Sequence, residues 1–208
     1  MLLPEIVIGT TNPAKARQCR ALLERLGVAA VDVGDVLADP PQLPEDGASA
    51  AANAAAKAAT LASRLNRPVI ALDYGLVFEG IPDAEQPGLA VRRLGPDGGR
   101  ASDEESLEHY SALIRRHGGT LTGRWEIGAA IASADGAVRT TTTWVRRTFV
   151  ADASPSRVPG HPLASLQYAD TPPRTYVSEL TDEEEAAFFG RVLDEPLGRL
   201  VAEIFSCS

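Results

Sequence analysis

The sequence predicts an α/β fold, in which strands and helices alternate around a central sheet. Two observations predict it. Residues 3–9 form a short apolar run that leads through a polar turn into a helical pattern, and a second strand follows at residues 28–33. Farther on, a helical pattern at residues 49–65 precedes another apolar strand at residues 68–72. Strands that alternate with helices in this order are typical of βαβ units.

The first helix is expected at residues 14–26, where apolar side chains recur at helical spacing. Pro13 suits the first turn of a helix, and Gly27 is a common residue just after its end. Residues 39–47 hold three prolines and are therefore expected to form a loop.

The helix at residues 49–65 follows from composition, because ten alanines lie between residues 48 and 62 and alanine is the strongest helix former. Asn53 and Lys57 are four residues apart and so share one face of this helix. The strand at residues 68–72 is expected to end at Asp73.

The second half of the chain mixes loops, a hairpin and helices. Asp135-Gly136 is the strongest hairpin signal, and strands are expected on either side of it at residues 124–133 and 137–150. Irregular structure is expected at residues 83–99 and 151–173, and helices at 103–117, 181–190 and 195–205. No linker interrupts the chain, so residues 1–208 are predicted to form a single domain with two lobes.

The composition excludes several classes of protein. With 28 acidic against 20 basic side chains the net charge is −8, whereas a nucleic-acid-binding protein needs a basic surface to replace phosphate counterions. No apolar run approaches the ~20 residues that cross a bilayer. Two cysteines, Cys19 and Cys207, cannot form a disulfide framework. We therefore expect a cytoplasmic protein without a nucleic-acid or membrane partner.

Lysine is rare in this chain. Of the 20 basic residues, 18 are arginine, and lysine occurs only at Lys15 and Lys57. Lysine carries a compact ammonium that can enter a narrow phosphate site, whereas arginine is a wide planar fork. The alternative explanation is that two lysines remain by chance in an arginine-rich sequence. The residues around Lys15 and Lys57 decide between chance and a phosphate site.

Polar residues follow the first predicted strand. Thr10, Asn12 and Lys15 lie where this strand ends and the first helix begins, at the edge where open α/β sheets bind ligands. Backbone N–H groups, a hydroxyl, an amide and a lysine at that place can cradle a phosphate. The alternative is a capped helix start with a solvated lysine.

Two carboxylates lie on neighbouring predicted loops. Glu45 precedes the alanine-rich helix, and Asp73 follows the next strand. Such a pair can hold Mg²⁺, a hard cation that shares its ligand shell with phosphates, and a carboxylate beside the metal can position or deprotonate water. The alternatives are that Asp73 caps a turn and that Glu45 is a solvated loop charge.

Together these motifs resemble those of the inosine/xanthosine triphosphate pyrophosphatase family. The family's motifs are matched here by TTNPAK (10–15), by EDGAS (45–49) with NAAAKA (53–58), and by LDYGL (72–76). Downstream, Pro87-Gly88 and Arg93 resemble the family's Pro-Gly loop and its arginine. Both lysines fall on motif positions, which argues against chance.

The resemblance implies an enzyme that hydrolyses nucleoside triphosphates to monophosphates and pyrophosphate with Mg²⁺ as cofactor. It implies a mixed, elongated central sheet flanked by helices, two lobes with a cleft between them, and a homodimer. Lys57 and Asp73 would be catalytic, with Asp73 directing the water, and Glu45 and Asp73 would bind Mg²⁺. Substrate contacts are expected at Thr10, Asn12, Lys15, Tyr74, Gly75, Arg93 and Arg191.

The chain also departs from the family's pattern. The family's acidic pair reads Leu72-Asp73 here, and Tyr74 replaces a small hydroxyl residue. The base-holding aromatic loop has become HPLASL (161–166), and a lysine and a histidine have become Glu185 and Gly190. We therefore expect altered base specificity. Two alternatives stay open: a nucleotide-binding protein of the same fold with weakened or lost catalysis, or hydrolysis of another nucleotide phosphate.

Overall fold

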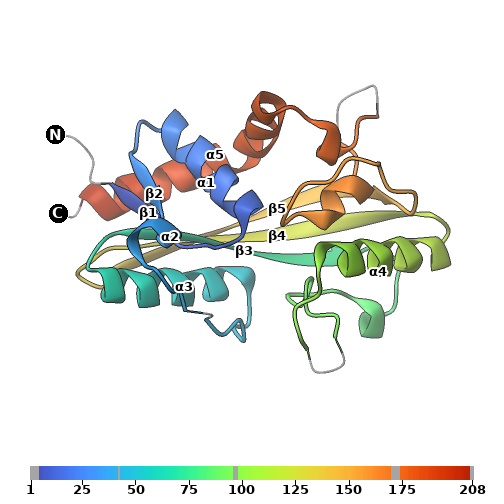
Figure 1. Cartoon of the computed structure of the whole chain (residues 1–208), viewed down its shortest axis with the longest axis horizontal. Coiled ribbons are helices and arrows are strands. Elements are labelled where there is room, and N and C mark those ends of the chain that lie inside the picture. The colour runs from blue at the N-terminus through green and yellow to red at the C-terminus, as the bar shows by residue number, and fades with distance from the viewer. Residues whose placement is uncertain (1–4, 42, 96–97, 170–173, 207–208) are drawn as a thin grey trace. The chain divides into compact units, whose positions relative to one another are not determined.

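The computed structural model describes residues 5–41, 43–95, 98–169 and 174–206. Its sheet has five strands in the order β2-β1-β3-β4-β5 (Figure 1). The strands are β1 (Ile6–Ile8), β2 (Ala30–Asp32), β3 (Val69–Phe78), β4 (Thr120–Ala132) and β5 (Val138–Val150). The helices are α1 (Pro13–Arg25), α2 (Val33–Val36), α3 (Ala50–Leu65), α4 (Asp103–Arg116) and α5 (Asp182–Ser206).

The sheet is mixed. β1 is parallel to both of its neighbours, since Val7 pairs with Val31 of β2 and with Val69 of β3. β4 and β5 form the predicted hairpin, in which Ser133 N donates to Ala137 O across the Asp135-Gly136 turn (2.9 Å). The predicted α/β fold with a mixed sheet flanked by helices is therefore confirmed.

The chain divides into two compact units. The first comprises Met1–Asp73, Ile127–Thr143 and Phe189–Ser208, and the second comprises Tyr74–Glu126 and Trp144–Phe188. The single domain over residues 1–208 and the cleft between two lobes stay predictions. Among the residues described, no helix combines the length and apolar character needed to cross a membrane.

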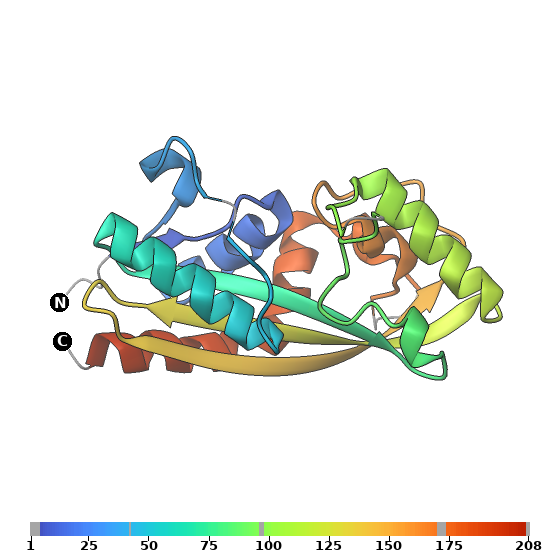
Figure 2. The same cartoon turned by 90° about the horizontal axis from the view of Figure 1, so that it is seen from below.

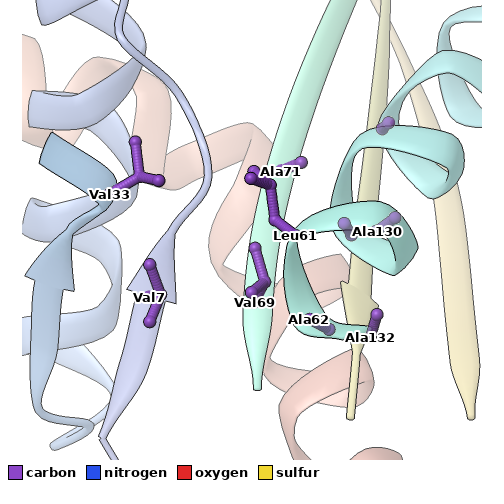
Figure 3. Close-up of a cluster of buried hydrophobic side chains, with 10 residues drawn as sticks. Val7, Val33, Leu61, Ala62, Val69, Ala71, Ala130 and Ala132 are labelled. Atoms are coloured by element: carbon purple, nitrogen blue, oxygen red, sulfur yellow. The ribbon is translucent and has the colours of Figure 1, made fainter. Parts of the chain in front are cut away.

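The core of the first unit lies between α3 and the sheet (Figure 3). The alanine-rich face of α3 buries small side chains together with Leu61, and the strands oppose it with Val7, Val69 and Ala71. Figure 1 shows α3 on one side of these strands and α1 on the other, and in Figure 2, seen from below, α3 lies in front of the strands. Small residues let the helix backbone approach the sheet closely, which fixes the positions of the polar side chains on α3.

The second unit has its own core and a well-capped helix. Ser102 and Glu105 form a reciprocal capping box at the start of α4. Phe78 packs edge-on against Phe149, with ring centroids 5.1 Å apart, and the hydroxyl of buried Tyr110 donates to Val91 O. The expected loop at residues 151–173 contains a short 3-10 helix at Pro162–Leu166, and residues 170–173 lie outside the described residues.

Two predicted elements differ most from the structure. β3 continues to Phe78 instead of ending at residue 72, because apolar Leu76 and Phe78 are buried and extend the strand. Asp73 therefore lies inside a strand. The helices expected at residues 181–190 and 195–205 are one helix, α5, with Pro196 inside it.

The continuity of α5 has a physical reason. A proline removes one backbone hydrogen bond and disfavours the turn before it. Here the apolar residues keep their spacing across the proline, and each of them is buried: Phe189, Leu193, Leu197, Leu200 and Ile204. This uninterrupted buried stripe outweighs the local cost of the proline.

Candidate functional site

Asp73 is the centre of a buried polar cluster in the first unit. Its side chain is 6% exposed, and both of its carboxylate oxygens accept hydrogen bonds. Lys15 Nζ and Lys57 Nζ donate to Oδ1 at 3.2 and 3.1 Å, and Asn53 Nδ2 donates to Oδ2 at 2.9 Å. The expectation that Asp73 caps a turn is therefore wrong, and the two lysines of the chain meet on one oxygen.

The topology explains why these residues meet. Ile8, the last residue of β1, pairs with Ile70 of β3, so β3 runs past the carboxyl end of β1. Asp73 lies on that projecting part, three residues beyond Ile70, while Lys15 comes from the first turns of α1 after β1. The cluster thus forms at the strand edge at which parallel α/β sheets bind ligands.

Helix α3 supplies two members of the cluster from one face. Asn53 and Lys57 are four residues apart, so both point toward Asp73. Lys57 Nζ also donates to Glu45 Oε1 in the loop before α3. Asn53 Oδ1 accepts from Gly47 N at 2.8 Å, which ties that loop to the helix and turns the amide nitrogen toward Asp73.

The charges in the cluster perturb its titration. Burial by itself raises the pKa of Asp73, but the neighbouring ammonium groups of Lys15 and Lys57 and the Asn53 hydrogen bond outweigh it and lower that pKa. Burial lowers the pKa of Lys15, and the attraction of Asp73 opposes this effect without cancelling it. Asp73 is therefore ionised at every physiological pH, and Lys15 is more easily deprotonated than an exposed lysine.

Thr10 and Asn12 lie beside this cluster but mainly organise the start of α1. Asn12 Oδ1 accepts from Ala14 N and Lys15 N at 2.9 and 3.1 Å, and Thr10 Oγ1 accepts from Asn12 N. The capped helix start is therefore confirmed, with Asn12 binding two of the backbone N–H groups expected to cradle a phosphate. A role for Thr10, Asn12 and Lys15 in phosphate binding stays a prediction. The solvated lysine is wrong, because the Lys15 side chain is 18% exposed and pairs with Asp73.

Three predicted substrate contacts belong to the second unit. Half-buried Tyr74 lies edge-on to Trp125, with ring centroids 6.2 Å apart. Gly75 is buried against the predicted Pro-Gly loop, where an added Cβ would lie 3.3 Å from Gly88 O and 3.0 Å from Leu89 Cδ2. Half-buried Arg93 follows that loop, and its backbone N donates to Ala90 O. The structure thus brings Gly75 and the Pro-Gly loop together, and a role for these residues in binding stays a prediction.

Arg191 lies on α5 in the first unit and is exposed. Its neighbour Gly190 faces an ion pair between Arg25 and Asp194, whose closest N–O distance is 2.7 Å. A Cβ at position 190 would lie 3.0 Å from the Arg25 guanidinium and 2.9 Å from Asp194 Oδ2. Arg25 thus occupies the space in which a larger side chain at position 190 would lie.

Sequence reasoning missed two contributors to the cluster. One is Asn53, which is 1% exposed; its helical spacing to Lys57 predicts a shared face but not a contact with Asp73. The other is the backbone carbonyl of Leu72, which accepts from Lys15 Nζ at 3.4 Å. Any residue at position 72 would offer that carbonyl, so the identity of the residue gives no sign of this contact. In a strand, the side chains of successive residues point to opposite faces of the sheet. The buried Leu72 side chain therefore lies away from the polar face that Asp73 occupies.

Comparison with known proteins relates the chain to one family. The model of the Ham1 family matches residues 6–143. A dITP/XTP pyrophosphatase of Geobacillus kaustophilus (strain HTA426) is 33% identical over 134 residues, which span 62% of each chain. A dITP/XTP pyrophosphatase of Anaeromyxobacter dehalogenans (strain 2CP-C) is 30% identical over 162 residues, 67% of this chain and 69% of that protein. The first alignment thus spans less than two thirds of the relative's length.

Solved structures support the fold. The Ham1 protein of Staphylococcus aureus superposes with a TM-score of 0.65 at 19% identity and covers 98% of this chain and 100% of its own. A HAM1 protein from Coxiella burnetii gives a TM-score of 0.69 at 20% identity with the same coverage. At this identity the likeness concerns the fold alone.

Proposed function

Because the chain belongs to the Ham1 family, we propose that it hydrolyses nucleoside triphosphates to nucleoside monophosphates and pyrophosphate. One observation carries the proposal: a buried carboxylate, Asp73, held between the two lysines of the chain at the carboxyl edge of parallel strands. The names of its relatives, dITP/XTP pyrophosphatases, agree with a triphosphate substrate.

The residues of the cluster have complementary parts in this reaction. Lys15 and Lys57 would bind phosphate oxygens, since ammonium groups neutralise the crowded charges of a triphosphate. Asp73 would orient the attacking water. Once phosphates attract the two ammonium groups, their hydrogen bonds to Asp73 Oδ1 weaken, and this oxygen becomes available to accept from the water.

Glu45 and Asp73 fit a divalent cation such as Mg²⁺. Their carboxylate oxygens converge on one positive centre, the Lys57 ammonium, and carboxylates are the ligands that a hard cation prefers. Within the described parts of the chain no three His, Cys, Asp or Glu side chains gather as a metal site. Two carboxylates suffice for Mg²⁺, which keeps waters and shares its shell with phosphates. When bound, it would neutralise charge that develops on the leaving pyrophosphate.

The base specificity is proposed to differ from that of inosine and xanthosine nucleotide pyrophosphatases. An enzyme discriminates between nucleotide bases through the groups that pair with the base. At the positions where the family resemblance places such groups, this chain has other residues. At one of them, Gly190, Arg25 and Asp194 fill the adjacent space. The family's histidine could not be restored there without moving this ion pair.

The experiment that tests the proposal measures products. Purified protein with Mg²⁺ is incubated with a panel of nucleoside triphosphates that includes deaminated purines, pyrimidines and deoxy forms, and pyrophosphate and phosphate release are followed in parallel. We expect pyrophosphate from one subset of the panel. Phosphate release alone would overturn the reaction type. Silence across the panel with thermal stabilisation by a nucleotide would favour the binding protein.

Two further expectations from the resemblance stay predictions. A homodimer would be tested by sedimentation equilibrium, which should give twice the mass of one chain, 22.0 kDa. A cytoplasmic location would be tested by fractionation of the source cells.

A further inference from the structure

One side chain bridges the two carboxylates that a cation would need. Lys57 Nζ donates both to Glu45 Oε1 and to Asp73 Oδ1, the latter at 3.1 Å. The carboxylates come from different segments, the loop before α3 and strand β3, and the Lys57 ammonium joins them. The Lys57 ammonium is therefore the shared counter-ion of both groups.

A divalent cation must compete with Lys57 for these oxygens. Mg²⁺ binds oxygen at ~2.0–2.1 Å, much closer than an ammonium nitrogen, and both positive centres would compete for the same lone pairs. The net charge of the cluster also disfavours cation binding, because the two lysines already neutralise Glu45 and Asp73. A cation entering alone would leave an excess of positive charge among side chains that are only 6–29% exposed, where it is poorly screened.

We propose that Lys57 is a built-in counter-ion which excludes the divalent cation from the free protein, so that cation and triphosphate must enter together. This inference rests on the proposed function. The phosphate oxygens supply negative charge to which Lys57 can turn, and its flexible four-carbon chain lets the ammonium leave the carboxylates without movement of α3. Glu45 and Asp73 are then released for the cation.

Lys15 provides a matched control. Its ammonium lies at 3.2 Å from the same Asp73 oxygen, nearly the same distance as that of Lys57, and Lys57 in addition donates a hydrogen bond to Glu45. Lys15→Met and Lys57→Met therefore remove the same charge beside Asp73. They differ in whether the bridge between the two carboxylates is lost.

The test measures binding of Mn²⁺ to the free protein by electron paramagnetic resonance, without nucleotide. We expect weak binding to the wild type, at least tenfold tighter binding to Lys57→Met, and a gain below threefold for Lys15→Met. Adding Glu45→Gln to Lys57→Met should abolish the gain. Circular dichroism checks that each variant is folded, and Lys57→Gln serves as a second variant if Lys57→Met is not.

Each other outcome counts against the inference. Equal gains in Mn²⁺ affinity for Lys15→Met and Lys57→Met would mean that removal of either positive charge has the same effect. An unchanged Mn²⁺ affinity in Lys57→Met and Lys57→Gln would mean that Lys57 does not compete with the cation for the carboxylates. Tight Mn²⁺ binding by the wild type would also overturn it. Because no turnover is measured, failure here leaves the proposed hydrolysis standing, and a silent substrate panel leaves the Mn²⁺ result interpretable.

Discussion

Gly128→Ala tests the packing that positions the site. Gly128 lies on β4 beneath the first turn of α3, and an added Cβ would lie 2.1 Å from Ala51 N and 2.2 Å from Ala50 C. These are backbone atoms, so no side chain can swing away. To restore a contact of 3.4 Å from 2.1 Å, the start of α3 must retreat by about 1.3 Å.

The cost follows from this displacement. Overpacking a core costs about 1–3 kcal/mol of unfolding free energy. Because the added Cβ would meet backbone atoms of α3, which cannot move alone, we expect Gly128→Ala to cost near the upper end of this range. For a chain of this size about 3 kcal/mol lowers Tm by about 6–12 °C. Because Asn53 and Lys57 move with α3, turnover should fall by about 100-fold, as expected for a misplacement near 1 Å.

The assay is thermal and urea unfolding followed by far-UV circular dichroism. Tryptophan fluorescence would report on the second unit alone, because Trp125 and Trp144 both belong to it. Gly34→Ala is the control, since Gly34 lies in α2 with no atom within 4 Å of an added Cβ, and it should be neutral or stabilising by about 0.4–1 kcal/mol. A Tm for Gly128→Ala equal to that of Gly34→Ala would refute the reasoning.

Three further predictions concern single side chains. Lys57→Arg should lower kcat/KM at least tenfold, about 1.4 kcal/mol, because a planar fork does not replace an ammonium that contacts Glu45 and Asp73; wild-type kinetics would contradict this. Because the pKa of Asp73 is lowered, this group stabilises the fold fully above its ordinary value of 3.8 and loses that contribution as the pH falls through the folded value. The difference in unfolding free energy between wild type and Asp73→Asn should thus be constant from pH 7 to pH 5 and shrink only below about pH 4; a difference already lost by pH 5 would speak against it. Burial raises the pKa of the Cys19 thiol to about 12, so in a Cys207→Ser variant a disulfide reagent at pH 8 should label Cys19 only after denaturation, and rapid labelling of the native protein would show the burial to be wrong.

Much of the fold could be predicted because local signals and burial agree. The helix at residues 50–65 has both alanine content and a Ser49 cap, and the Asp-Gly turn fixes the hairpin. The family resemblance inferred from three motifs is confirmed by the match over residues 6–143. The errors arose where tertiary burial overrides a local breaker, as at Pro196 in α5 and at Asp73 in β3.

The meeting of Lys15, Lys57, Glu45 and Asp73 could be predicted only in part. Their positions at strand and helix ends placed them at one edge of the sheet, but pairing between residues as distant as Lys15 and Asp73 depends on strand order and register, which no local pattern contains. The role of Asn53 and the Leu72 carbonyl became visible only with that register. The second unit's part in binding stays a prediction.

The central claim is that Asp73, held between two lysines, serves hydrolysis and not binding alone. The most direct test measures pyrophosphate release and nucleotide affinity for wild type and Asp73→Asn with the triphosphate that the wild type prefers. Because this substitution removes a negative charge beside Lys15 and Lys57, we predict loss of turnover by at least a thousandfold with nucleotide binding unchanged or tighter. Turnover that persists in Asp73→Asn at the wild-type rate would contradict the account.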